Sequence, residues 1–289
     1  MNANPNNNQL IIADAHVHIY DCFDLDHMLN SALNNFQYIS ESKGYQDNFT
    51  GILFLTETSN QNKFNQLRDY TITKDELIKN KLKTWNLSQT QENVSLSVCN
   101  QLDRRIFLIA GRQIVTAENL EVLALITNQN FEDGLPLKVT IQKIISAGGI
   151  PVLPWGVGKW MGRRGKLLNN LLAENNFPTL FLGDNGGRPV FWSRPSYFQQ
   201  AETKGLQILP GTDPLPLISE SSRPGSFGFA IQDSLNLEKP GAHIKQMLLE
   251  PNKSLEPYGR LENPFGFIRN QLAIRSEKFK LKNWSLTPT

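Results

Sequence analysis

Two histidines separated by one residue, His16 and His18, end an apolar run that begins at Leu10. Because successive side chains of a strand point to opposite faces, the two imidazoles share one face and can converge on one ion. Imidazole is a common ligand of divalent transition metals. The spacing therefore predicts part of a metal site. The alternative is a structural pair of histidines whose hydrogen bonds are satisfied within a buried strand.

A loop rich in glycine and cations, residues 155–166, is the second stretch with chemical potential. It carries Lys159, Arg163 and Arg164 between a predicted strand and a predicted helix. Glycine lets backbone N–H groups approach an anion, a helix N-terminus attracts it, and arginine offers paired donors to phosphate or carboxylate. We therefore expect these three cations to bind substrate. A solvated surface loop is an equally good interpretation.

A shorter polar loop, residues 184–188, follows the next predicted strand with the sequence Asp-Asn-Gly-Gly-Arg. Its last residue, Arg188, is expected to join the substrate-binding cations. A tight turn explains the same composition, because asparagine and glycine both favour turns.

The elements that must position these residues alternate along the chain. Apolar runs predict strands at residues 10–19, 49–55, 105–110, 120–126, 150–153, 179–182 and 206–209. Helical spacing of apolar residues predicts helices at 25–36, 137–147, 166–175 and 195–204. Strands that alternate with helices of about ten residues indicate a parallel sheet or a closed α/β barrel. We expect one domain over residues 1–289.

Motif order across residues 10–215 resembles the PHP (polymerase and histidinol phosphatase) family of metal-dependent phosphoesterases. The segments that carry the resemblance are Asp14-Ala15-His16-Val17-His18, Thr56-Glu57-Thr58, Gly111-Arg112-Gln113, Gly148-Gly149 with the strand after it, and Gly211-Thr212-Asp213. The resemblance implies a distorted seven-stranded TIM-like barrel related to the amidohydrolases.

The chain departs from this family at several metal ligands. Of the histidines that the resemblance implies, two are replaced by Thr58 and Leu215 and two more are absent from the third and fourth motifs. The bridging glutamate is replaced by Gln113. A site for three ions is therefore not expected. The ligand set that remains is His16, His18 and Asp213, with Gln113 and Asp184 as further metal ligands and Glu57 as a second catalytic carboxylate.

One divalent zinc, manganese or iron ion fits two imidazoles and a carboxylate. Such an ion lowers the pKa of a bound water from 15.7 to roughly 7, and a neighbouring carboxylate can take the proton. Asp213 is predicted to ligate the ion or to act as that base. Because Pro214 follows it, a simple turn residue is the alternative.

We therefore expect a metal-dependent, phosphoesterase-like hydrolase acting on an anionic small molecule. Two alternatives remain open: a barrel without turnover that binds a ligand or partner, and an amidohydrolase-like enzyme that cleaves a C–N or lactone bond. Activity that survives His16→Ala would exclude the metal mechanism.

Composition narrows the partners. Lys and Arg number 29 and Asp and Glu 27, for a formal charge of +2. This balance favours neither nucleic acid nor a membrane surface. Two cysteines in a chain of this size suggest reduced thiols and a cytoplasmic protein. Residues 1–9 are expected to be a disordered leader, 60–104 an insertion, and 216–289 an extension over or beside the barrel.

Overall fold

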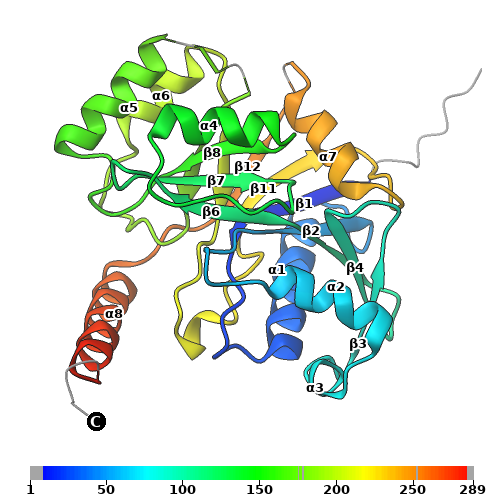
Figure 1. Ribbon diagram of the computed structural model, residues 1–289. Coiled ribbons are helices and arrows are strands. Elements are labelled where there is room, and N and C mark those ends of the chain that lie inside the picture. Colours follow the sequence, from blue (N-terminus) through cyan, green and yellow to red (C-terminus); the bar gives the residue numbers. More distant parts are fainter. Residues whose placement is uncertain (1–8, 175, 178, 252, 285–289) are drawn as a thin grey trace, which may run out of the picture.

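The structure is a computed structural model that describes residues 9–174, 176–177, 179–251 and 253–284. Its strands form one sheet of seven strands and one of five, which face each other (Figure 1). The expected leader, residues 1–9, lies outside the described residues except for Gln9, whose side-chain amide donates to Thr50 Oγ1 at 2.9 Å. No helix in the described ranges is long and apolar enough to cross a membrane.

The larger sheet is mixed. Its strands, in spatial order, are β12 (Glu256–Gly259), β11 (Phe227–Gln232), β1 (Leu10–Val17), β2 (Phe49–Leu55), β5 (Arg105–Ile109), β4 (Ser95–Asn100) and β3 (Trp85–Gln89). Strands β1, β2 and β5 run parallel, and every other neighbouring pair is antiparallel. The stretch expected to be an insertion, 60–104, thus supplies two strands at one edge.

The smaller sheet is also mixed. Its order is β10 (Ile208–Gly211), β9 (Phe181–Asn185), β8 (Ile150–Pro154), β7 (Glu121–Leu125) and β6 (Gly111–Val115). Strands β10, β9 and β8 are parallel, whereas β7 is antiparallel to both of its neighbours.

The predicted distorted (β/α)7 TIM-like barrel is wrong, because the described strands make two sheets and not one closed ring. The expected βαβ order fails at β6 and β7, which form an antiparallel hairpin in place of a strand, helix and strand. It fails again at β1, where the antiparallel strand β11 takes the position that a barrel gives to a parallel strand. The architecture therefore depends on which strands pair with each other, and local periodicity does not determine this pairing.

The two sheets touch along two seams. Glu57, just after β2, forms an isolated parallel bridge with Arg112 of β6. On the other side, the backbone N–H of Asp213 donates to the carbonyl of His16 at 2.8 Å. Gly111 marks the change of sheet, because a Cβ there would lie 2.5 Å from the Leu55 carbonyl oxygen. Residues from distant parts of the chain thus meet at one end of the paired sheets.

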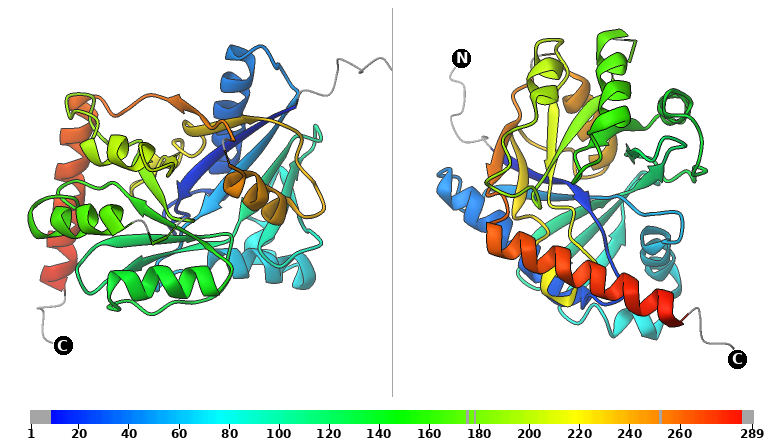
Figure 2. Two further views of the ribbon diagram at one scale, coloured as in Figure 1. Left: turned by 90° about the horizontal axis from the view of Figure 1, so that it is seen from above. Right: turned by 90° about the vertical axis from the view of Figure 1, so that its left-hand side faces the viewer.

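Helices cover the outer faces and one end of this pair of sheets (Figures 1 and 2). They are α1 (Leu25–Ser42), α2 (Lys63–Thr73), α3 (Glu76–Lys79), α4 (Leu137–Ser146), α5 (Gly162–Glu174), α6 (Ser196–Glu202), the 3-10 helix η1 (Ile218–Glu220), α7 (Pro240–Leu249) and α8 (Pro264–Trp284). Helix α8 projects from the body at the lower left of Figure 1. The segment 216–289, which was expected to be an extension, also contributes β11, which lies between β12 and β1 in the larger sheet.

The main core lies between the sheets. Alternate residues of β1, Ile11, Ala13 and Ala15, pack there against side chains from both sheets and against Ile244 and Met247 of α7. Helix α7 closes the end of the core at which β1 begins, and the two histidines stand at the other end. A second cluster lies between β1 and β2 and helix α1, and a third lies under α4, α5 and α6.

Candidate metal centre

A β-bulge in β1 aims both histidines into the space between the sheets. The pairing with β2 shifts between Asp14 and Val17, so the alternation of faces changes there. Before the bulge Ala15 faces the core between the sheets, and after it Val17 faces α1. His16 and His18 therefore point toward β6 and β10, where they are almost fully buried. Tyr20 stacks on His18 with ring centroids 5.4 Å apart and limits the rotation of that ring.

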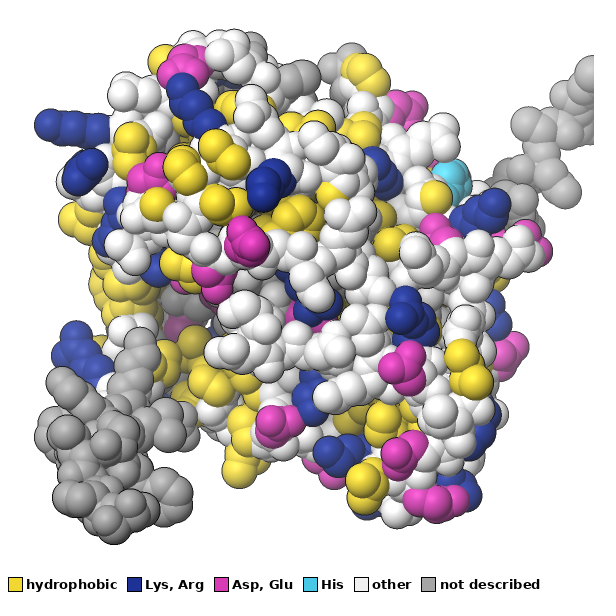
Figure 3. Space-filling model, in the orientation of Figure 1, with side chains coloured by type: hydrophobic (Ala, Val, Ile, Leu, Met, Phe, Trp, Pro, Cys, Tyr) yellow, Lys and Arg dark blue, Asp and Glu magenta, His cyan; other side chains and the backbone are white. Residues whose placement is uncertain are grey.

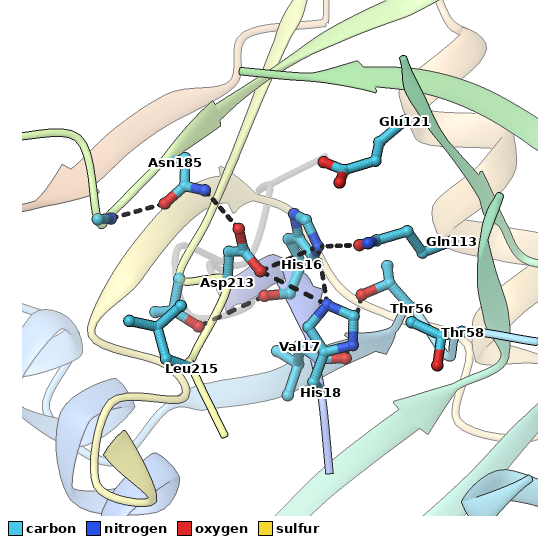
Figure 4. Close-up of polar contacts among 12 residues, drawn as sticks. His16, Val17, His18, Thr56, Thr58, Gln113, Glu121, Asn185, Asp213 and Leu215 are labelled. Atoms are coloured by element: carbon cyan, nitrogen blue, oxygen red, sulfur yellow. Dashed lines mark hydrogen bonds and ion pairs between the residues drawn. The ribbon is translucent and has the colours of Figure 1, made fainter. Parts of the chain in front are cut away.

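Three ligand atoms converge at this point (Figure 4). The Nε2 atoms of His16 and His18 are 3.1 Å apart, and Asp213 Oδ1 lies 3.4 Å from the first and 3.5 Å from the second. Ligands bound tetrahedrally at about 2.0–2.1 Å from a zinc-sized ion are separated by roughly 3.4 Å. The triangle therefore has the dimensions of three corners of a tetrahedral site.

The ionisation of the three groups suits a cation. Burial lowers the pKa of His16, so this ring is neutral at neutral pH, the form that binds metals. Burial alone would raise the pKa of Asp213, but the two histidines and the Asn185 amide outweigh it and hold that pKa well below its usual range. The Nδ1 atom of His18 is buried and has no hydrogen-bond partner among the described residues. Neighbouring protein groups therefore do not account for both nitrogens of this ring.

Asp14 fixes the relative position of the strands that carry the ligands. Its carboxylate accepts from the backbone N–H and hydroxyl of Thr212 at 2.9 and 2.6 Å, from Gly225 N at 2.9 Å and from His16 N at 3.2 Å. Burial raises the pKa of Asp14 to about 6, although these donors lower it. Asp14 thus holds the segment around Thr212 against β1, which sets the distance between Asp213 and the histidines.

The backbone on both sides of Thr212 is specialised for close approach. Asp213 adopts φ +46°, a left-handed conformation that non-glycine residues rarely use and that often marks functional sites. A Cβ on Gly211 would lie 2.5 Å from the Cβ of His16. Only glycine therefore fits where β10 crosses β1.

Gln113 is the sequence-predicted ligand that stands nearest to this triangle. Its Oε1 lies 3.0 Å from His16 Nε2, and its backbone N–H donates to the carbonyl of Glu57 at 2.8 Å. A carbonyl oxygen at this position can be a fourth ligand.

Glu57, expected to be catalytic, has both carboxylate oxygens engaged. Oε2 accepts from Arg112 Nη1 at 2.9 Å, and Oε1 accepts from the backbone N–H of Phe64 at 2.9 Å. Burial raises the pKa of Glu57, while the Phe64 N–H and the Arg112 guanidinium oppose the shift. The structure thus places this side chain in the seam between the sheets.

Asp184, expected as a metal ligand, is paired with Arg188, expected to bind substrate. Two bonds join them: Arg188 Nε to Asp184 Oδ1 at 2.9 Å and Nη2 to Oδ2 at 2.8 Å. Arg188 also donates to the Trp192 carbonyl at 3.1 Å. Asp184 is not one of the three clustered ligands, and the pair consumes donors that an anion would need.

The loop at residues 155–166 is folded onto the protein. Lys159 Nζ lies 2.9 Å from Glu121 Oε1, and Arg164 donates to the carbonyls of Gly158 and Asn119. Arg163 is exposed and forms no ion pair with other described residues. On the face shown in Figure 3, basic and acidic side chains are interspersed.

Two side chains at the centre were not singled out from the sequence. Asn185 donates to Asp213 Oδ2 at 2.5 Å, which leaves Oδ1 toward the histidines. Glu121, at the start of β7, points toward the cluster in Figure 4. The sequence signal for Glu121 was its position in the alternation of the strand, because it lies on the same face as Leu123 and Leu125, which belong to the inter-sheet core. Strand β9 continues to Asn185, three residues beyond the predicted end at 182.

Comparisons with known proteins support the fold alone. No protein-family model matches the chain, and a search of curated proteins finds no match. Among solved structures, the crystal structure of PsfC from Pseudomonas syringae PB-5123 is similar, with a TM-score of 0.54 over 93% of this chain and 99% of that chain. The two sequences are 12% identical. Since no family model matches and the sheets are not closed into a barrel, the resemblance to the PHP family is wrong.

Proposed function

We propose that this protein is a metal-dependent hydrolase that uses one divalent ion held by His16, His18 and Asp213. The observation that carries the proposal is the triangle of ligand atoms with sides of 3.1, 3.4 and 3.5 Å. Two imidazoles and one carboxylate are a donor set suited to zinc, iron or manganese. The side chain of Asp213 is 27% exposed, whereas the histidines are buried, so substrate would approach from the side of Asp213.

An ion bound there would lower the pKa of a water ligand and polarise the bond to be cleaved. The surrounding side chains would orient the ligands. Asn185 binds Oδ2 of Asp213 and so directs Oδ1 to the histidines. Gln113 Oε1 lies 3.0 Å from His16 Nε2 and would complete the ligand set.

Glu121 is the carboxylate that we assign to proton transfer. Asp213 turns one oxygen to the histidines and the other to Asn185, which leaves it poorly placed to accept a further proton. Glu121 faces the same space, and Lys159 holds one of its oxygens at 2.9 Å. Its second oxygen can accept a proton from water.

The proposal is tested by metal content and turnover in the parent, His16→Ala, Asp213→Ala and Glu121→Gln. We expect about one zinc, manganese or iron per chain in the parent, loss of the ion in the first two variants, and retention in Glu121→Gln with turnover reduced by about 10²-fold or more. Phosphate esters are the first substrate class to screen, followed by lactones and amides. If the parent protein binds none of the three metals, the proposal is contradicted.

The second candidate is a ligand-binding protein without turnover, which the pairing of Arg188 with Asp184 and of Lys159 with Glu121 favours. With these cations engaged, a phosphate group would depend mainly on the ion for its countercharge. A metal-loaded parent that hydrolyses no member of the three substrate classes would support this candidate. Turnover lost together with the ion in His16→Ala would exclude it.

A further inference from the structure

A polar hollow of about 400 Å³ lies beside the seam between β2 and β6. Arg112 and Ile114 line it, and on β6 their side chains face away from that of Gln113, whose Oε1 lies 3.0 Å from His16 Nε2. The hollow therefore lies across β6 from the metal centre.

The charged side chains that line the hollow neutralise each other. They are Glu57 and Arg112, joined at 2.9 Å and both buried. Arg112 Nη1 also donates to the Gln61 carbonyl at 3.0 Å, and Phe64 N occupies the second Glu57 oxygen. A charged group entering the hollow would thus lose its hydration without gaining an opposite charge.

The other polar groups of the hollow are amides and a hydroxyl. Ser59, Asn62 and Asn130 are exposed along it. Asn62 Oδ1 accepts from Asn65 Nδ2 at 2.7 Å, which leaves the Asn62 NH₂ group. The side chains of Ser59 and Asn130 make no hydrogen bond to other described residues. Amides and hydroxyls both donate and accept, so their natural partners are groups that also do both.

Phe131 adds a half-buried aromatic wall. An aromatic face packs against the C–H groups of a ring whose edge carries the polar atoms. Phosphates and carboxylates only accept hydrogen bonds and ammonium groups only donate them, whereas hydroxyls do both. The lining therefore matches an uncharged molecule with several hydroxyl groups.

We propose that this hollow binds an uncharged polyhydroxylated molecule, a sugar or polyol, at a site separate from the metal centre. Binding there needs no ion, so this proposal and the proposed function can fail separately.

The test measures binding of D-glucose, D-ribose and myo-inositol to the full chain by saturation-transfer NMR, with N-acetylglycinamide as a neutral amide probe and inorganic phosphate as an anion. At least one polyol should bind in the millimolar range, and the double variant Ser59→Ala with Asn130→Ala should weaken it about tenfold, as expected from two lost hydrogen bonds. Asn170→Ala removes an exposed amide on α5 away from the hollow and should leave binding unchanged.

Metal uptake and hydrolysis of phenyl phosphate, which has no hydroxylated part, are measured in parallel. Polyol binding that survives the double variant, no binding of any polyol, or stronger binding of the amide or phosphate probe would overturn the proposal for the hollow. If polyols bind as expected while the parent takes up no metal, the proposed function fails and the hollow keeps its ligand.

Discussion

The metal centre and the basic loops both lie at strand ends, but the fold uses their side chains in opposite ways. At the centre, His16, His18 and Asp213 turn toward one another although 195 positions separate Asp213 from His18. In the loops, Arg188 and Lys159 are each turned onto a nearby carboxylate. Three ligands that converge, with only one charged group among them, indicate a site for an ion. Cations that are already paired with carboxylates indicate a structural role.

The same contrast appears in what surrounds each region. The ligands are held by a buried network on Asp14, by a strained backbone at Asp213 and by a glycine that permits contact between β10 and β1. The loop cations hold the loops themselves, as Arg164 does through two carbonyls. Substitutions should therefore remove the bound ion in the first region and leave metal binding unchanged in the second.

The largest effect is expected from Asp14→Ala. Four donors, on His16, Thr212 and Gly225, would lose their acceptor in a fully buried position. Several unsatisfied buried groups cost about 3–5 kcal/mol in unfolding free energy. We expect this loss in denaturant unfolding, together with loss of the bound ion. Asp69→Ala, on an exposed carboxylate of α2, is the control and should change stability by less than about 0.5 kcal/mol.

If Asp14→Ala unfolds like the parent, Asp14 does not hold β10 to β1. If it is destabilised but keeps the ion at full affinity, the network stabilises the fold without setting the ligand positions. Either result would weaken the contrast between the two regions.

An intermediate effect is expected from Arg188→Ala. Arg188 and Asp184 form a bidentate pair with exposed side-chain fractions of 6% and 13%, so removal of one partner leaves a mostly buried charge. The cost should be about 3 kcal/mol in unfolding free energy. Metal content should not change, because neither residue is in the ligand cluster.

The matched control is Arg163→Ala, which removes an exposed cation from the other loop and should alter stability by less than about 0.5 kcal/mol. Calorimetry with inorganic phosphate completes the comparison. If the parent binds phosphate and the folded Arg188→Ala variant does not, Arg188 binds substrate as the sequence predicted.

Local pattern was sufficient for some elements and insufficient for the architecture. The apolar spacing of residues 25–36 predicted α1, whose buried residues include Met28, Leu29 and Phe36, and the helix continues to Ser42. The barrel was wrong because the partner of a strand depends on contacts far along the chain. Only Ala110 separates β5 from β6, and the local sequence does not show that the two strands belong to different sheets.

The candidate centre shows the same limit. The His-x-His spacing concerns neighbours in one strand, so alternation alone relates the two imidazoles. The bulge that places His16 and His18 on the opposite face from Asp14 depends on tertiary packing, as do the partners of Arg188 and Lys159. The sequence of a glycine-rich loop does not indicate whether a cation in it will pair with a carboxylate.

The smallest effect is expected from Lys159→Ala, and it separates the two uses of a loop cation most directly. The side chains of Lys159 and Glu121 are 30% and 22% exposed, so their pair should contribute no more than about 1 kcal/mol to stability. If Lys159 acts only by orienting Glu121, its removal should lower kcat/KM by about fivefold in the parent, equivalent to about 1 kcal/mol, and by almost nothing in Glu121→Gln. A double-mutant cycle on the best substrate measures this coupling. If Lys159 instead binds an anionic substrate directly, Lys159→Ala lowers kcat/KM equally in both backgrounds, mainly by raising KM, and the loop at residues 155–166 then belongs to the active site along with the metal centre.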